Sequence, residues 1–190
     1  MKLLGSRDLA IGYDSPLQDS LSFDLSKGEL LLVNGPNGCG KSTFLNTVLG
    51  KIKPLSGKVE LSQESMKMEL LPQIVSFHLP FSVSLGEILE AYGVPEKFFS
   101  LFEGDFLEKK WSEASGGEKQ KVLILSRIGS HCDVLVLDEP FNHIDKSSIK
   151  KVEQFLAGLL RSGDVGAMIM VSHIPPHFDG DLPVREMSFQ

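Results

Sequence analysis

The stretch that decides the fold is Gly35-Pro36-Asn37-Gly38-Cys39-Gly40-Lys41-Ser42-Thr43. It matches G-x-x-x-x-G-K-[ST], the pattern of a phosphate-binding loop, or P-loop. An apolar run at 29–34 leads into it, and a helix-forming stretch at 42–50 leads out of it. Because the motif requires a strand before it and a helix after it, this context favours a P-loop over a glycine-rich turn that holds a lysine by chance.

A loop of this kind binds phosphate mainly through its main chain. Glycines allow successive N–H groups to point inward at phosphate oxygens, and the helix that follows adds the positive end of its dipole. Lys41 can reach the β- and γ-phosphates of a nucleotide, and the Ser42 hydroxyl can ligate Mg²⁺. The stretch therefore predicts a nucleotide site, but it leaves open what the nucleotide is used for.

Length and composition indicate a single globular domain. The chain has 190 residues, of which 42% are hydrophobic and 23% charged. The net charge of −6 argues against a protein that coats nucleic acid, since phosphate neutralisation needs a basic face. Cys39 and Cys132 have no paired spacing, which suggests a reducing compartment. The first residues do not resemble a signal peptide, and no apolar run approaches the about 20 residues that span a bilayer, so we expect any membrane role to involve a partner.

Strand and helix patterns continue on both sides of the P-loop. Strands are predicted at 2–13, 21–25, 58–61, 66–71, 134–137, 167–171 and 184–189, and helices at 119–128 and 146–160. Continuous apolar strands such as 134–137 are typical of the interior of a parallel sheet. The strands at 58–61 and 66–71 are expected to form an antiparallel addition. The predicted fold is therefore α/β, a P-loop NTPase core with a mostly parallel sheet and an antiparallel β addition near the N-terminus.

The segment that starts near residue 85 has a more helical pattern. Ser84 and Glu87 have the spacing of a capping box, which predicts a short helix towards Tyr92. A second helix is predicted at 95–102, with its aromatic residues in the core. We expect one domain over 1–190, with a helical subdomain at about 85–130 inserted between the two halves of the core.

Two acids follow the apolar strand at 134–137. Asp138 and Glu139 stand at its carboxyl end, which is the edge where open α/β sheets bind ligands. Alone, they could be solvated acids at a strand end. Beside a P-loop, Asp138 is placed to hold Mg²⁺, and Glu139 is placed to orient and deprotonate an attacking water.

Four weaker signals each have a simple structural alternative. The stretch 114–118, Ala-Ser-Gly-Gly-Glu, precedes a helix and could bind an anion, or it could be a flexible helix start. His173 could donate a hydrogen bond to a γ-phosphate, or it could be structural. Gln73 could contact Mg²⁺ or the water. Tyr13 could stack on a base, although an aromatic residue in a strand more often packs in a core.

Together, and in this order, these motifs resemble the nucleotide-binding domain of ABC ATPases. Tyr13 lies where the family has its base-stacking aromatic residue, the P-loop looks like Walker A, and Gln73 looks like the Q-loop glutamine. The remaining motifs, listed in order, are the signature at 114–118, Walker B with its glutamate at 134–139, the D-loop at His143-Ile144-Asp145 and the H-loop histidine at His173. Ala114, Glu118 and His143-Ile144 depart from the usual pattern. Little follows His173, so no C-terminal regulatory domain is expected.

The resemblance implies an ATPase that works as a dimer, expected to be a homodimer, with two ATP molecules and Mg²⁺ between two cassettes. The implied nucleotide ligands are Tyr13, Asn37, Gly38, Cys39, Gly40, Lys41, Ser42 and Thr43 of one cassette, and Ser115, Gly116, Gly117 and Glu118 of the other. Ser42, Gln73 and Asp138 would hold Mg²⁺. Glu139, His173 and Gln73 would act in hydrolysis.

Two functions fit this resemblance. In the first, the chain powers a membrane transporter whose permease subunits are separate chains, and it lies in the cytoplasm on the inner face of the cell membrane. The apolar stretch 74–84 lies where family members receive the permease, and the run at 79–83 is loosely similar to ATPases of metal-ion uptake. In the second, a soluble ABC protein acts on ribosomes or DNA, and 140–145 is reminiscent of the translation-factor branch. That branch has two cassettes in one chain, and the DNA-acting branch has a long coiled coil. We therefore expect transport, with no direct binding to nucleic acid.

Overall fold

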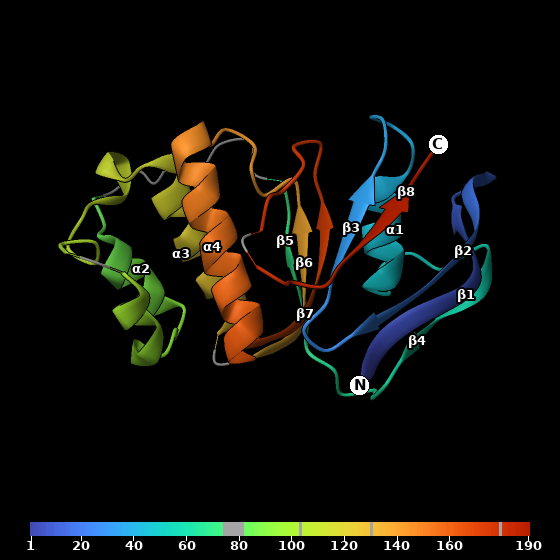
Figure 1. Ribbon diagram of the computed structural model, residues 1–190, viewed down its shortest axis with the longest axis horizontal. Coiled ribbons are helices and arrows are strands. Elements are labelled where there is room, and N and C mark those ends of the chain that lie inside the picture. The colour runs from blue at the N-terminus through green and yellow to red at the C-terminus, as the bar shows by residue number, and fades with distance from the viewer. Residues whose placement is uncertain (74–81, 103, 130, 179) are drawn as a thin grey trace.

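A computed structural model describes residues 1–73, 82–102, 104–129, 131–178 and 180–190 (Figure 1). The described residues form a five-stranded parallel sheet in the order β5-β6-β7-β3-β8. Its strands are β5 (Met68–Leu71), β6 (Cys132–Asp138), β7 (Val165–Val171), β3 (Leu30–Asn34) and β8 (Val184–Ser188). All seven residues of β7 are buried, as expected for a central strand that is covered on both faces.

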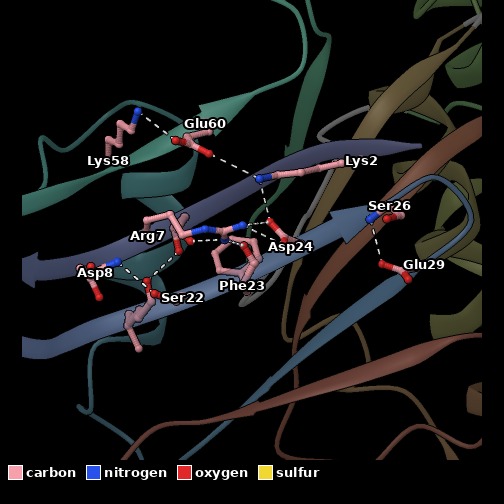
Figure 2. A network of polar contacts seen from close by, with 12 residues as sticks. Lys2, Arg7, Asp8, Ser22, Phe23, Asp24, Ser26, Glu29, Lys58 and Glu60 are labelled. Carbon is pink, nitrogen blue, oxygen red and sulfur yellow. Dashed lines mark hydrogen bonds and ion pairs between the residues drawn. The ribbon is translucent and has the colours of Figure 1, made fainter.

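A second, antiparallel sheet has the order β2-β1-β4, with β2 (Pro16–Ser26), β1 (Lys2–Gly12) and β4 (Ser56–Leu61). Figure 2 shows ion pairs that cross its strands. Asp24 of β2 pairs with Lys2 at 2.7 Å and with Arg7 at 2.9 Å, while Glu60 of β4 pairs with Lys2 at 3.4 Å. Hydrogen bonds from Arg7 and Lys2 lower the pKa of Asp24 to about 2. Opposite charges on neighbouring strands favour this register.

Helix α1 (Lys41–Val48) lies between the two sheets in Figure 1. Its buried side chains, which include Phe44 and Leu45, share one core with residues of both sheets. The Phe44 ring makes edge contacts with Phe23 of β2 and with Phe189, each with centroids 5.6 Å apart. This packing fixes α1 directly behind the P-loop.

The other face of the parallel sheet is covered by helices (Figure 1). They are α3 (Gly116–Ile128) and α4 (Lys146–Ser162), while α2 (Leu85–Ala91) packs against α3 on the side away from the sheet. The short 3-10 helices η1 (Glu96–Leu101) and η2 (Trp111–Glu113) belong to the same helical part. A second core joins their apolar side chains to Leu30 and Leu32 of β3. The capping box predicted at Ser84 and Glu87 is confirmed, because each side chain accepts the main-chain N–H of the other.

One expectation about the elements was wrong. The strand predicted at 66–71 was expected in an antiparallel addition, but β5 pairs parallel with β6, with Met68 opposite Val134. An isolated strand pattern does not reveal its partner, which is set by the packing of the whole chain. The helical stretch predicted at 95–102 is confirmed, and it is the 3-10 helix η1. Most of the apolar stretch expected to face a permease, at 74–84, falls outside the described residues.

None of the described helices combines the length and the hydrophobicity that a membrane crossing requires.

Candidate active site

Three adjacent strands of the parallel sheet end at the site. In the register of the sheet, Val171 of β7 lies between Val33 of β3 and Asp138 of β6. The P-loop follows β3, Glu139 follows β6, and His173 follows β7. Parallel strands have their carboxyl ends at the same edge, so motifs that are far apart in the sequence meet there.

A cleft of about 330 Å³ opens at this edge. Its described lining consists of Leu17, Asn37, Gly38, Gly40, Lys41, Ser42, Thr43, Gln73, Asp138, Glu139, Asn142, Val171 and His173. The structure thus brings together most of the P-loop residues predicted from the sequence with both acids, the histidine and Gln73. One cleft holds groups suited to phosphate, to a cation and to an attacking water.

The P-loop is shaped by glycines and leads into the positive end of α1. Gly38 and Gly40 have φ of 84° and 100°, which is the left-handed region that side chains disfavour. Helix α1 starts at Lys41, and its N-cap Gly40 makes no side-chain capping bond. The Lys41 Nζ donates to the carbonyls of Gly35 and Pro36, both at 2.8 Å. Lys41 is 8% exposed, so its ammonium group lies buried against these loop carbonyls.

A serine hydroxyl and a partly buried carboxylate face each other across the cleft. The Ser42 Oγ donates to the Asp138 Oδ2 at 3.3 Å. Burial raises the pKa of Asp138, the Ser42 hydrogen bond lowers it, and the nearby Glu139 charge raises it further. These oxygens and the Gln73 side chain form a donor set that suits a hard cation such as Mg²⁺, which takes few protein ligands together with phosphate and water.

Glu139 is held in a strained backbone conformation. Its φ is 52°, which is unusual for a residue with a side chain and is found at functional sites. The main-chain N–H of Glu139 donates to Val171 at 2.9 Å, and its carbonyl accepts from Asn142 at 3.2 Å. Its Oε2 lies 2.7 Å from the Nδ1 of His173 and accepts the His173 main-chain N–H at 3.1 Å. The carboxylate is thereby fixed at the cleft.

The predicted signature residues lie at the start of α3 and do not line the described cleft. Ser115 and Glu118 form a capping box, with bonds of 2.7 and 3.2 Å. Lys109 also binds the Glu118 carboxylate at 2.9 and 3.0 Å. A Cβ on Gly117 would lie only 2.7 Å from the Ser148 Cβ, so glycine allows the starts of α3 and α4 to meet.

The D-loop acid has a local structural role at the start of α4. Asp145 caps this helix by accepting the Ser148 N–H at 3.0 Å. Hydrogen bonds from Ser147 and Ser148 lower the pKa of Asp145 to about 2.

Some expected residues lie elsewhere, and some lining residues were missed. Tyr13 is 67% exposed and is absent from the described lining, as is Cys39. Leu17, Asn142 and Val171 line the cleft although the sequence did not single them out. Asn142 could have been found as a polar residue close behind Glu139, whereas the apolar Leu17 and Val171 carry no chemical signal.

The chain is similar in sequence to ATP-binding proteins of uptake systems. A sequence profile of the family described as "ABC transporter" matches residues 18–142. The high-affinity zinc uptake system ATP-binding protein ZnuC of Bacillus subtilis is 32% identical over 197 residues, which cover 91% of this chain and 85% of that protein. The molybdate import ATP-binding protein MolC of Haemophilus influenzae is 31% identical over 193 residues, or 92% and 74% of the two chains.

A solved structure shares the fold. It shows an inward-facing conformation of a transporter provisionally assigned to the metal-chelate ABC type, with 29% identity and a TM-score of 0.74 over 91% of this chain and 74% of that one. The family profile spans most of the chain and includes the P-loop, Gln73 and both acids of the cleft. The chain therefore belongs to the ABC transporter family and is one of its ATPase domains.

Proposed function

We propose that this chain is the ATP-hydrolysing subunit of an ABC import system, in which separate permease subunits carry the cargo. The observation that carries the proposal is the cleft in which Lys41, Asp138 and the histidine-bound Glu139 converge. Its loop and helix terminus suit the phosphates of ATP. The 32% identical zinc uptake protein and the 31% identical molybdate import protein support transport over an action on ribosomes or DNA.

The P-loop would bind the phosphates of ATP. Main-chain N–H groups of 37–43 and the N-terminus of α1 would cradle the phosphates, and Lys41 would exchange its bonds to the loop carbonyls for bonds to phosphate oxygens. Mg²⁺, held by Ser42, Asp138 and Gln73, would neutralise charge on the β- and γ-phosphates when bound. Leu17 and Val171 add apolar walls to the same cleft.

Glu139 would act as the general base in hydrolysis. Its carboxylate would orient a water for in-line attack on the γ-phosphate and take a proton from it. His173 fixes the carboxylate through its ring and its main chain, and its exposed ring would contact the γ-phosphate. Gln73, at the edge of the cleft, would contact the attacking water or the cation.

Closure of two cassettes would complete the site. Ser115, Gly116, Gly117 and Glu118 would reach the γ-phosphate bound by a second copy, so their absence from the cleft of their own chain is expected. The Ser115 Oγ accepts a hydrogen bond from the main chain, which leaves its O–H free to donate to phosphate. ATP would favour the closed homodimer, and hydrolysis would release it.

The proposed setting is the cytoplasmic face of the membrane, beside a permease that imports a metal ion, a metal chelate or a small oxyanion. A pull-down from detergent-solubilised cells, with mass spectrometry of the co-purifying proteins, tests this. We expect a polytopic membrane protein in stoichiometric amount. Recovery of ribosomal proteins or nucleic acid in its place would overturn the transport role while leaving the ATP site intact.

A further inference from the structure

Gln18 holds a carbonyl of the P-loop from outside the cleft. It lies near the start of β2, and its Nε2 donates to the main-chain oxygen of Cys39 at 3.2 Å and to that of Gln190 at 2.8 Å. A primary amide has two N–H donors, so these two oxygens use both of them. The described lining of the cleft includes the neighbouring Leu17 but not Gln18. Gln18 therefore contacts the P-loop without lining the described cleft.

Holding the Cys39 carbonyl also orients the N–H of Gly40, because both groups belong to one planar peptide unit. The C=O and N–H of a trans peptide point in opposite directions, so the Gly40 N–H points away from Gln18. Gly40 lines the cleft and has a φ of 100°, so this peptide leads into the left-handed bend that precedes α1. Peptide N–H groups at such a bend are the donors with which a P-loop binds phosphate.

The same loop is in close contact with two apolar residues. A Cβ on Gly40 would lie 3.2 Å from the Cβ of Leu17, and a Cβ on Gly35 would lie 2.9 Å from the Cβ of Phe189. Phe189 follows β8, is 3% exposed, and donates its N–H to Asn34 at 2.8 Å. The P-loop thus lies between the start of β2 and the end of β8, and Gln18 makes polar contacts with Cys39 of the loop and with Gln190.

We propose that Gln18 is a positioning residue for nucleotide binding, which holds the Cys39–Gly40 peptide in the orientation that phosphate requires. This inference deepens the proposed ATP-binding function and rests on it. Both hydrogen bonds are partly open to solvent, so water can satisfy the two carbonyls when the amide is removed. The peptide is then free to rotate, and the nucleotide must order it on binding.

The expected effect is therefore on affinity and not on chemistry. A preformed loop favours the bound nucleotide and the transition state equally, so its loss raises KM and leaves kcat nearly unchanged. Gln18→Met keeps the length of the side chain and removes both donors. We expect MgADP to bind it about tenfold more weakly, which corresponds to about 1.4 kcal/mol. Gln18→Glu keeps the shape and replaces the donors with an acceptor, so its affinity should fall at least as far.

Isothermal titration calorimetry with MgADP, together with steady-state ATP hydrolysis, tests the proposal on the full chain. Gln63→Met is the matched control, because Gln63 is an exposed glutamine outside the cleft. Lys41→Ala is the reference for a damaged P-loop. Thermal melts without nucleotide identify any variant that is unfolded. If Gln18→Met is unfolded, the test is made with Gln18→Glu.

The outcomes distinguish a failure of the role given to Gln18 from a failure of the proposed ATP-binding function. If wild type binds MgADP, Gln63→Met matches it, and the Gln18 variants bind more weakly at unchanged kcat, Gln18 positions the loop. If Lys41→Ala binds MgADP more weakly than wild type, but both Gln18 variants match wild type, the role of Gln18 is overturned and the ATP site stands. If Gln18→Met lowers kcat and the melting temperature at unchanged KM, its role is structural. Absence of binding to wild type would overturn the proposed function itself.

Discussion

The Oε2 atom of Glu139 makes two contacts with one residue: it lies 2.7 Å from the ring Nδ1 of His173 and accepts the His173 main-chain N–H at 3.1 Å. The Glu139 side chain is 11% exposed, whereas that of His173 is 56% exposed. The more buried partner is the proposed base, and the more exposed one is the residue proposed to contact the γ-phosphate. This pair joins the end of β6 to the end of β7 across the cleft.

His173→Ala removes the ring contact with Glu139 and keeps the main-chain contact. The main-chain N–H remains to hold Glu139, but the ring that fixes the carboxylate and is proposed to contact the γ-phosphate is lost. We expect kcat for ATP hydrolysis to fall by about 10²-fold or more, with ATP affinity little changed. His177→Ala is the control, because His177 is an exposed histidine four residues further along, and among the described residues its hydrogen bond to Glu153 comes from the main chain. Equal kcat in both variants would contradict the role given to His173.

Lys41→Ala should weaken ATP binding by about 10- to 100-fold, because charge-assisted hydrogen bonds contribute about 1.5–3 kcal/mol. The Lys41 ammonium is held within the loop by the carbonyls of Gly35 and Pro36. Fluorescence titration with a labelled ATP measures the change, and the exposed Lys53→Ala is its control. Wild-type affinity in the folded Lys41→Ala variant would rule out the P-loop site.

Asp138→Asn should stabilise the nucleotide-free protein while abolishing Mg²⁺-dependent hydrolysis. Burial raises the pKa of Asp138 above its unfolded value, so folding is favoured more at low pH and loses that contribution as pH rises through the folded pKa. The ionised carboxylate therefore costs stability at neutral pH, and asparagine removes this cost while still accepting from Ser42. A gain of about 1 kcal/mol would raise Tm by about 2–4 °C.

Thermal melts between pH 4 and 8 check the sign of this effect. The advantage of Asp138→Asn should shrink as pH falls and Asp138 takes up a proton. The exposed Asp19→Asn serves as a control outside the cleft. A variant less stable than wild type at pH 7 would show that the buried charge is stabilising, contrary to the expectation.

Two glycines of the neighbouring helices should respond in opposite ways to alanine. Gly117→Ala places a Cβ 2.7 Å from the Ser148 Cβ, which forces the starts of α3 and α4 apart and should cost about 1–3 kcal/mol. Gly158 in α4 has open space around an added Cβ, so Gly158→Ala should gain about 0.5–1 kcal/mol. Urea unfolding of both variants measures these changes. A Gly117→Ala variant as stable as wild type would contradict the close contact between the two helices.

The sequence predicted the features that depend on local spacing. The P-loop needs only its neighbouring strand and helix, and the capping box of Ser84 and Glu87 needs residues three apart, so both could be read directly. The meeting of Asp138 with Ser42 could be expected from the rule that parallel strands end at one edge. These features carry most of the chemistry of the cleft.

Features that depend on packing could not be predicted from the sequence. Strand β5 has the same pattern in either sheet, and its partner β6 is 60 or more residues away. Leu17 reaches the cleft because of the way β2 lies against the P-loop, which no motif records. Glutamine at position 18 has no pattern of its own, so its bond to Cys39 appears only in three dimensions.

The most direct measurement is a quenched-flow assay of ATP turnover by Glu139→Gln and wild type, with the oligomeric state followed by light scattering. Glutamine keeps an oxygen for the His173 N–H but cannot take a proton from water. We expect ATP to bind normally, hydrolysis to fall by about 10²–10⁴-fold, and a stable dimer to form with ATP but not with ADP. Hydrolysis at the wild-type rate by a folded Glu139→Gln protein would contradict the assignment of this cleft as the site of ATP hydrolysis.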